Sequence, residues 1–166
     1  MLARSSAIRF FCMRLARAGY TGFHLNLSTN IFSLSQDFPE LADPDAARHL
    51  ETLCDIVTAA RRCALEVFLS YYTIPLDGDH PVFSRIPAMR GSRIVNTARL
   101  HVLCPSSPET LAYWRGHFRD LFSLVPGLAG VLLIVGCEGF LHCYTAPVLE
   151  HGRTSCPACA GADAEK

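Results

Sequence analysis

The sequence is short of charge, and its few charges are balanced. Of the 166 residues, 18% are charged, and 15 lysine and arginine residues stand against 15 aspartate and glutamate residues. A dedicated nucleic-acid-binding protein normally has a basic excess, so we expect no nucleic-acid partner. The hydrophobic content of 50% is too high for a disordered chain. The sequence therefore predicts a folded protein of about one domain, long enough to bury a core.

The sequence also lacks the motifs of several common protein classes. It has no glycine-rich phosphate loop and no Gly-x-Ser-x-Gly elbow, so nothing favours nucleotide binding or serine hydrolysis. The longest apolar stretch, Leu121–Leu141, is long enough to span a membrane, but helix-breaking residues and one acid interrupt it. We therefore expect no membrane partner. The interrupting residues are Pro126, Gly127, Gly130, Gly136, Glu138 and Gly139.

The N-terminal segment allows two interpretations. Its arginines, with no acid before Asp37, resemble a mitochondrial presequence. The same segment carries an apolar stripe at helical spacing, which predicts a surface helix over residues 3–18, and we favour this interpretation because a strand-like run follows directly. No secretory signal is evident, so we expect a cytoplasmic protein with free thiols. The stripe consists of Ile8, Phe11, Cys12 and Leu15.

Helical patterns alternate with apolar, strand-like runs along the chain. After the first helix, a second is expected to begin at Asp43 and Pro44, and a third at Ser107 and Pro108, because these pairs combine a capping residue with a proline at the first helical position. The run after the third helix is apolar on both faces, which is typical of parallel strands covered by helices. The strand-like runs cover residues 23–27, 64–72, 129–135 and, more briefly, 99–103, where we expect a strand or an extended entry to the third helix.

A glutamate stands where the most apolar of these runs ends. The Gly-Cys-Glu-Gly sequence at 136–139 places Glu138 at the carboxyl end of that strand, where α/β proteins carry their chemistry. Burial there would raise the pKa of the carboxyl group, as a general acid requires near neutral pH. The alternative is a loop acid that faces water.

Several segments lead up to Glu138 and include it. They are Pro105–Glu109, the helix 111–124, the Val-Pro-Gly-Leu-Ala-Gly-Val segment at 125–131 and Cys137-Glu138-Gly139. Together these segments resemble one stretch of glycoside hydrolase family 67, the α-glucuronidases. The resemblance implies that Glu138 is the general acid, with Cys137 in place of the family's small residue. Asn26, Asn30 and the Phe-Pro-Glu-Leu segment at 38–41 also resemble wider carbohydrate-active (β/α)₈ barrels.

The resemblance implies an α/β fold, a partial (β/α) TIM-type barrel with about three to four parallel strands and three helices. We expect this glycosidase-like domain over residues 1–142 and a cysteine-containing tail over 143–166. A complete barrel takes about 250 residues, and no second catalytic carboxylate follows Glu138 in a strand-like context. The partner would then be the missing half of the barrel or a second copy of the chain. A non-catalytic fragment with a structural or carbohydrate-binding role is the alternative.

Polar and aromatic side chains at the strand ends are candidate sugar ligands. Amides and imidazoles bond hydroxyl groups, and aromatic faces stack on sugar rings. The alternative for each is a polar residue whose bonds are satisfied within the fold. The candidates are Asn26, Asn30, Tyr72, His101 and His142.

The eight cysteines suggest a second kind of site. Cys156-Pro-Ala-Cys159 is half of a zinc site, and Cys143, His142 or His151 is placed to complete it. We therefore name Cys143, Cys156 and Cys159 as candidate metal ligands, with zinc as the only cofactor considered. A redox pair or an unpaired tail remnant is the alternative. The remaining cysteines, Cys104 among them, are interpreted as free thiols or small core residues. A small zinc-binding α/β protein is thus a rival to the glycosidase-like hypothesis.

Overall fold

The computed structural model divides the chain into two compact units. It describes residues 2–72, 74–95, 97, 99–134, 142–144, 149–150 and 153–161. Unit 1 comprises Met1–Leu34, Ala42–Tyr71 and Phe118–Leu132, and unit 2 comprises Ser35–Leu41, Tyr72–His117 and Leu133–Lys166.

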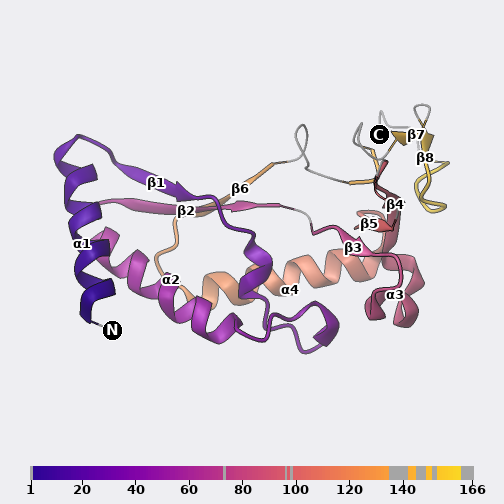
Figure 1. The fold of residues 1–166 in the computed structure, drawn as a ribbon, viewed down its shortest axis with the longest axis horizontal. Helices are drawn as coiled ribbons and strands as arrows, with labels where there is room; N and C mark the ends of the chain where they lie inside the picture. The colour runs from indigo at the N-terminus through magenta and orange to yellow at the C-terminus, as the bar shows by residue number, and fades with distance from the viewer. Residues whose placement is uncertain are drawn as a thin grey trace. The chain divides into compact units, whose positions relative to one another are not determined.

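Unit 1 is built on a three-stranded parallel sheet. Strand β2 (Glu66–Tyr71) lies between β1 (Gly22–Leu25) and β6 (Gly130–Leu133). The β1–β2 register places Phe23 opposite Val67, and Figure 1 shows the two strands side by side. The predicted α/β class is confirmed, and the sheet with its helices is consistent with part of a (β/α) barrel.

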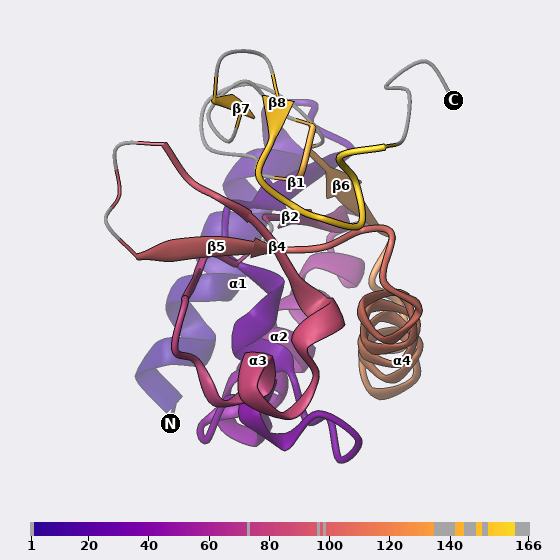
Figure 2. The same cartoon turned by 90° about the vertical axis from the view of Figure 1, so that its right-hand side faces the viewer.

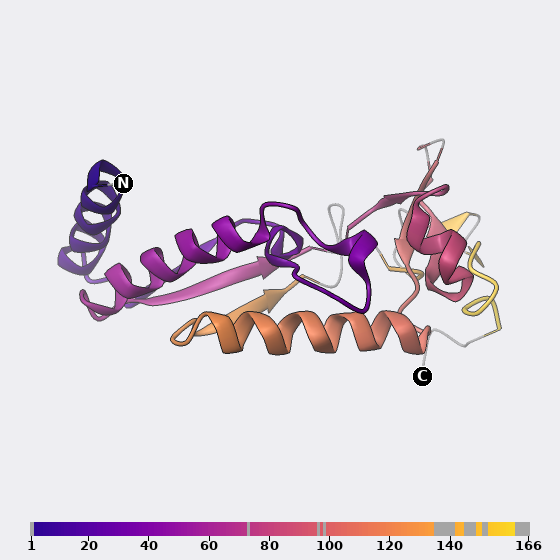
Figure 3. The same cartoon turned by 90° about the horizontal axis from the view of Figure 1, so that it is seen from below.

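The helices of unit 1 supply half of the buried residues in its apolar core. Helix α1 (Leu2–Arg17) packs against α2 (Ala46–Arg61), and α2 runs along the sheet, as Figure 3 shows. The final turns of α4 (Pro108–Leu124) also belong to this unit. The buried residues of the core are Cys12, Phe32, Leu50, Leu53, Val57, Ala60, Leu65, Val67, Leu69, Leu121, Val125 and Leu128.

Of the two helix starts predicted from a capping residue followed by proline, one is confirmed and one is wrong. Helix α4 begins at Pro108 as predicted, and Ser107 Oγ accepts a hydrogen bond from the Thr110 amide at 3.4 Å. Helix α2 begins at Ala46, later than predicted, because Asp43 forms a turn before it. The Asp43 carboxylate accepts from the Asp45 amide at 2.8 Å, and its carbonyl accepts from the Ala46 amide at 3.0 Å.

Strand β6 is less covered than its apolar sequence predicts. Leu132 and Leu133 are 45% and 59% exposed in the described part of the chain. Among the described strands, β6 pairs with β2 and forms an edge of the sheet. A strand covered on both faces needs helices on both sides.

Unit 2 carries a small antiparallel sheet. Strand β5 (Leu100–Leu103) lies between β3 (Leu76–Asp77) and β4 (Arg90–Arg93). The predicted strand at 99–103 is therefore present, but it is antiparallel to both neighbours and belongs to this second sheet. A short hairpin of β7 (Leu149–Glu150) and β8 (Arg153–Thr154) follows later in the chain.

One short helix of unit 2 has no counterpart among the predicted elements. Helix α3 (Pro81–Arg85) follows His80, whose Nδ1 accepts a bond from the Val82 amide. Its buried face joins a core of Phe38, Leu41, Leu76, Val82, Phe83, Met89, Leu103 and Tyr113. Within the described residues, no helix of either unit is long and apolar enough to cross a membrane.

Candidate metal centre

Four buried cysteines of unit 2 bring their sulfur atoms together. The Sγ atoms of Cys104, Cys143, Cys156 and Cys159 all lie within 4.8 Å of one another, and each residue is 0–1% exposed. Cys104 Sγ lies 3.5 Å from Cys156 Sγ and 3.6 Å from Cys159 Sγ. The seven cysteines that the structure describes are all free thiols. These four are therefore close enough to hold one metal ion.

Three separate segments of the chain position these cysteines. Cys104 directly follows β5, Cys143 lies in the described segment 142–144, and the Cys156-x-x-Cys159 pair follows β8. Hydrogen bonds hold the β8 segment beside β4. Ser92 Oγ bonds Thr154 Oγ1, and the Arg93 amide donates to Ser155 Oγ at 2.9 Å. Figure 2 shows the yellow segment that carries β8 next to β4 and β5.

Two of the segments present their sulfur atoms from similar turns. The Ser107 amide donates to the Cys104 carbonyl at 3.1 Å, and the Cys159 amide donates to the Cys156 carbonyl, also at 3.1 Å. In each turn a backbone amide also acts to lower the pKa of the first cysteine: that of Ser106 for Cys104, and that of Cys159 for Cys156. Such N–H···S bonds stabilise thiolates, which are the form of cysteine that binds metals.

Two further polar contacts reach the sulfur atoms, and the cysteines differ in pKa. The Ser92 amide donates to Cys143 Sγ at 3.4 Å, and Ser106 Oγ lies 3.3 Å from Cys159 Sγ. A hydrogen bond from the Cys143 thiol lowers the pKa of Cys104 to about 5, whereas burial raises the pKa of Cys156 to about 11. A metal ion bound by these four residues would replace the protons that remain on their thiols.

The spacing of the sulfurs fits a tetrahedral ion better than a disulfide. Metal–sulfur bonds of about 2.3 Å place the sulfurs of a tetrahedral Zn²⁺ site about 3.8 Å apart. Cys104 Sγ lies 3.5 Å from Cys156 Sγ and 3.6 Å from Cys159 Sγ, which is close to that value. A disulfide requires about 2.05 Å. The residues present therefore fit a four-thiolate zinc site.

The sequence identified three of the four cysteines. The structure brings Cys143, Cys156 and Cys159 together and adds Cys104, for which the sequence predicts only a free thiol or a small core residue. The sequence contains one sign that Cys104 resembles Cys156, because both cysteines are followed directly by proline. The other predicted candidate, His142, uses Nδ1 to accept a bond from the Tyr144 amide at 3.2 Å, and His151 lies outside the described residues.

The predicted sugar ligands fall into both units. Asn26 and Asn30 belong to unit 1, where Asn30 Nδ2 donates to Ser28 Oγ at 2.7 Å. Tyr72, His101 and His142 belong to unit 2. The structure does not bring the five into one described site, and their role as sugar ligands stays a prediction. Glu138 lies outside the described residues.

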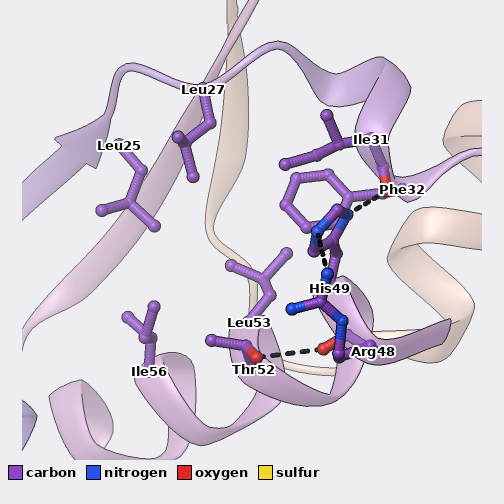
Figure 4. A pocket seen from close by; sticks show the side chains of 9 residues that line it. All are labelled: Leu25, Leu27, Ile31, Phe32, Arg48, His49, Thr52, Leu53 and Ile56. Atoms are coloured by element: carbon purple, nitrogen blue, oxygen red, sulfur yellow. Dashed lines mark hydrogen bonds between the residues drawn. The ribbon is translucent and has the colours of Figure 1, made fainter. Parts of the chain in front are cut away.

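Unit 1 has a pocket of its own between the end of β1 and helix α2. Its volume is about 220 Å³, and apolar side chains form most of its wall (Figure 4). The polar side chains His49 and Arg48 in the wall already have partners. His49 Nδ1 donates to the Ile31 carbonyl at 3.0 Å, and Arg48 pairs with Asp45 at 3.0 Å. The lining residues are Leu25, Leu27, Ile31, Phe32, Arg48, His49, Thr52, Leu53 and Ile56.

No family model matches the chain, and no curated protein matches it. Among solved structures, the chain is similar to a chitobiase from Flavobacterium johnsoniae, with a TM-score of 0.48 and 19% sequence identity. The match covers 81% of this chain and 21% of the chitobiase, so the chain spans about a fifth of the length of that protein.

Proposed function

We propose that the protein binds one zinc ion through Cys104, Cys143, Cys156 and Cys159, and that this ion is a structural element of unit 2. The observation that carries the proposal is the convergence of four buried sulfur atoms from three segments of the chain. Four protein ligands fill a tetrahedral shell and leave no position for water or a substrate. The ion would therefore stabilise the fold and take no part in a reaction.

The chemistry of the ligands favours zinc among the common metals. A set made only of thiolates is soft, and a tetrahedral arrangement of four sulfurs is typical of zinc or iron. Calcium and magnesium prefer oxygen ligands, and the cluster offers none. Zinc has no redox chemistry, which suits a site whose sulfurs are shielded from solvent.

The composition of the surrounding core supports a structural role for the metal. Among the described residues, the buried cluster at this end of unit 2 contains Ile94, Val102 and the four cysteines, with the partly buried Leu100 and Tyr144 packed against it. Such a small cluster buries little apolar surface, so the hydrophobic effect alone holds these segments weakly. A structural zinc site contributes on the order of 10 kcal/mol in zinc-finger peptides, which is enough to hold them.

Zinc titration followed by native mass spectrometry tests the proposal. The wild-type chain should take up one zinc ion per molecule. Cys104→Ser should lose this ion, since a serine hydroxyl is a poor ligand for zinc. Cys54→Ser is the matched control, because Cys54 is a half-buried thiol of helix α2 that bonds the Leu124 carbonyl. A wild-type chain that takes up no zinc, or a Cys104→Ser variant that binds it normally, would overturn the proposal.

A carbohydrate-directed function is the second candidate, and the sequence resemblance around Glu138 favours it. Under this hypothesis Glu138 is the general acid of a glycosidase-like site at the carboxyl end of the parallel strands. Glu138→Gln should abolish release of uronic acid, or of another sugar, from an oligosaccharide, while Glu150→Gln should leave it unchanged. Absence of any hydrolysis by the unmutated chain would remove the enzyme hypothesis. Sugar binding without hydrolysis would favour the non-catalytic form.

A further inference from the structure

One peptide group connects a histidine to the cysteine cluster. The carbonyl oxygen of Gly91 and the amide nitrogen of Ser92 belong to the same peptide unit in β4. The Gly91 carbonyl lies 3.1 Å from His101 Nδ1, and the Ser92 amide donates to Cys143 Sγ at 3.4 Å. A carbonyl only accepts hydrogen bonds, so the proton of this contact sits on His101 Nδ1.

We propose that His101 is a positioning residue for the metal centre, acting on Cys143 through the Gly91–Ser92 peptide. The proposal rests on the proposed zinc-binding function. A hydrogen bond to a carbonyl oxygen polarises the whole amide and makes its N–H a stronger donor. The stronger N–H···S bond then withdraws electron density from the thiolate. A metal ion held by four thiolates keeps an excess of negative charge, so each such bond stabilises the complex.

The backbone around this peptide is adapted to the contact. A Cβ atom on Gly91 would lie 2.9 Å from Cys143 Sγ and 2.7 Å from the Val102 carbonyl. Only glycine therefore lets the peptide approach the sulfur so closely. Gly91 and Cys143 are both buried, which shields the bonds from competing water.

The imidazole of His101 is held in the orientation that the contact requires. Its ring meets Phe83 edge to face, with the centroids 6.3 Å apart. On another side, a Cβ on Gly78 would lie 3.2 Å from His101 Nε2, so the absence of a side chain at 78 makes room for the ring. The pairing of Arg93 with His101 in the β4–β5 ladder fixes the backbone below it.

The tautomer of His101 in the zinc-loaded wild-type protein gives a test that needs no variant. Nitrogen-15 NMR distinguishes a proton on Nδ1 from one on Nε2. The proposal requires the Nδ1–H tautomer, or the doubly protonated ring, at neutral pH. A neutral ring with its proton on Nε2 would overturn the proposal even if the protein binds zinc normally.

Two variants test the effect on the metal itself, with cobalt(II) in place of zinc. His101→Leu removes the hydrogen-bond donor and keeps an apolar contact with Phe83. In His101→Asn, the Nδ2–H of the asparagine takes the place of the imidazole Nδ1–H. For His101→Leu we expect a shift of the sulfur-to-cobalt charge-transfer band to longer wavelength and roughly tenfold faster metal loss to a chelator. His101→Asn should resemble the wild type in both measurements.

The outcomes separate the two proposals. If the wild type binds metal but His101→Leu keeps its band position and its rate of metal loss, the role of His101 is wrong and the zinc site stands. If His101→Asn behaves like His101→Leu, the N–H donor is not the cause, and the proposal is also wrong. If the wild type shows no thiolate–cobalt band, the proposed function itself fails. If His101→Leu does not fold, the tautomer of His101 in the wild type and the spectrum of His101→Asn still test the proposed role of His101.

Discussion

The sulfur atoms of Cys104 and Cys156 lie 3.5 Å apart although 52 residues separate them in the chain. Both residues begin a Cys-Pro turn whose first carbonyl accepts an amide three residues later. The antiparallel strands β4 and β5 carry Cys104 to the point where the segment after β8 is held beside β4. The metal centre is therefore a product of unit 2 as a whole and not of one local motif.

Removing zinc should speed hydrogen exchange in the cysteine-bearing segments of unit 2 and leave exchange in the sheet of unit 1 unchanged. A ligand that binds only the folded state stabilises it by mass action, so a chelator withdraws that stability. Hydrogen exchange after chelation should accelerate at the amides of Ser92, Cys159 and Ala160. The amide of Ala129, which bonds the Val67 carbonyl in unit 1 at 2.9 Å, serves as the control. Equal acceleration at Ala129, or none at Ser92, would contradict a structural role confined to unit 2.

Adding one methyl group at Gly91 should weaken metal binding. The new Cβ of Gly91→Ala would meet the Val102 carbonyl at 2.7 Å and Cys143 Sγ at 2.9 Å, so the backbone of β4 must shift. We expect at least about tenfold weaker zinc binding in a chelator competition. Gly116→Ala is the matched control in α4, where the added Cβ has no atom within 4 Å. It should leave zinc affinity unchanged and raise the stability of the helix by about 0.5–1 kcal/mol.

The ion pair of Glu40 with Arg85 should make unit 2 sensitive to acid. Arg85 Nε and Nη2 lie 2.5 and 2.8 Å from the two carboxylate oxygens, and this bonding lowers the pKa of Glu40 below its usual value. A lowered pKa means that the pair contributes stability above the ordinary glutamate pKa and that this contribution is lost as the pH falls below it. Glu40→Gln should therefore lower the melting temperature by a few degrees at pH 7 and by progressively less toward pH 3.

Asp37→Asn is the control for this experiment. A third bond of Arg85 to this segment uses the Asp37 backbone carbonyl, at 3.1 Å, which the substitution keeps. This variant should follow the wild type across the pH range. A Glu40→Gln difference that persists unchanged at pH 3 would show that the carboxylate charge is not responsible.

Local patterns in the sequence predicted the elements of unit 1 well. The alternation of helices and apolar runs identified α1, α2, β1, β2 and β6, because apolar periodicity reports directly on burial against a neighbouring layer. The predicted start of α2 at Pro44 was wrong, since the Asp43 side chain and carbonyl stabilise a competing turn. The direction of β5 was not predictable, because strand pairing depends on partners far away in the chain.

In the candidate site, too, local sequence patterns predicted some residues, and contacts between distant segments revealed the others. Cys156 and Cys159 were found because two cysteines three residues apart form a recognised half-site. Cys104 was missed because its partners follow it at distances of 52 and 55 residues. His101 was considered as a sugar ligand because of its position on a strand, and only the three-dimensional structure shows its bond to the Gly91 carbonyl.

X-ray absorption at the zinc edge of the reconstituted protein tests the central proposal most directly. It measures the type, number and distance of the atoms around the metal. We expect four sulfur atoms at about 2.3 Å and no nitrogen or oxygen in the first coordination shell. A shell containing oxygen or nitrogen ligands, or a protein that retains no stoichiometric zinc, would contradict the four-cysteine site.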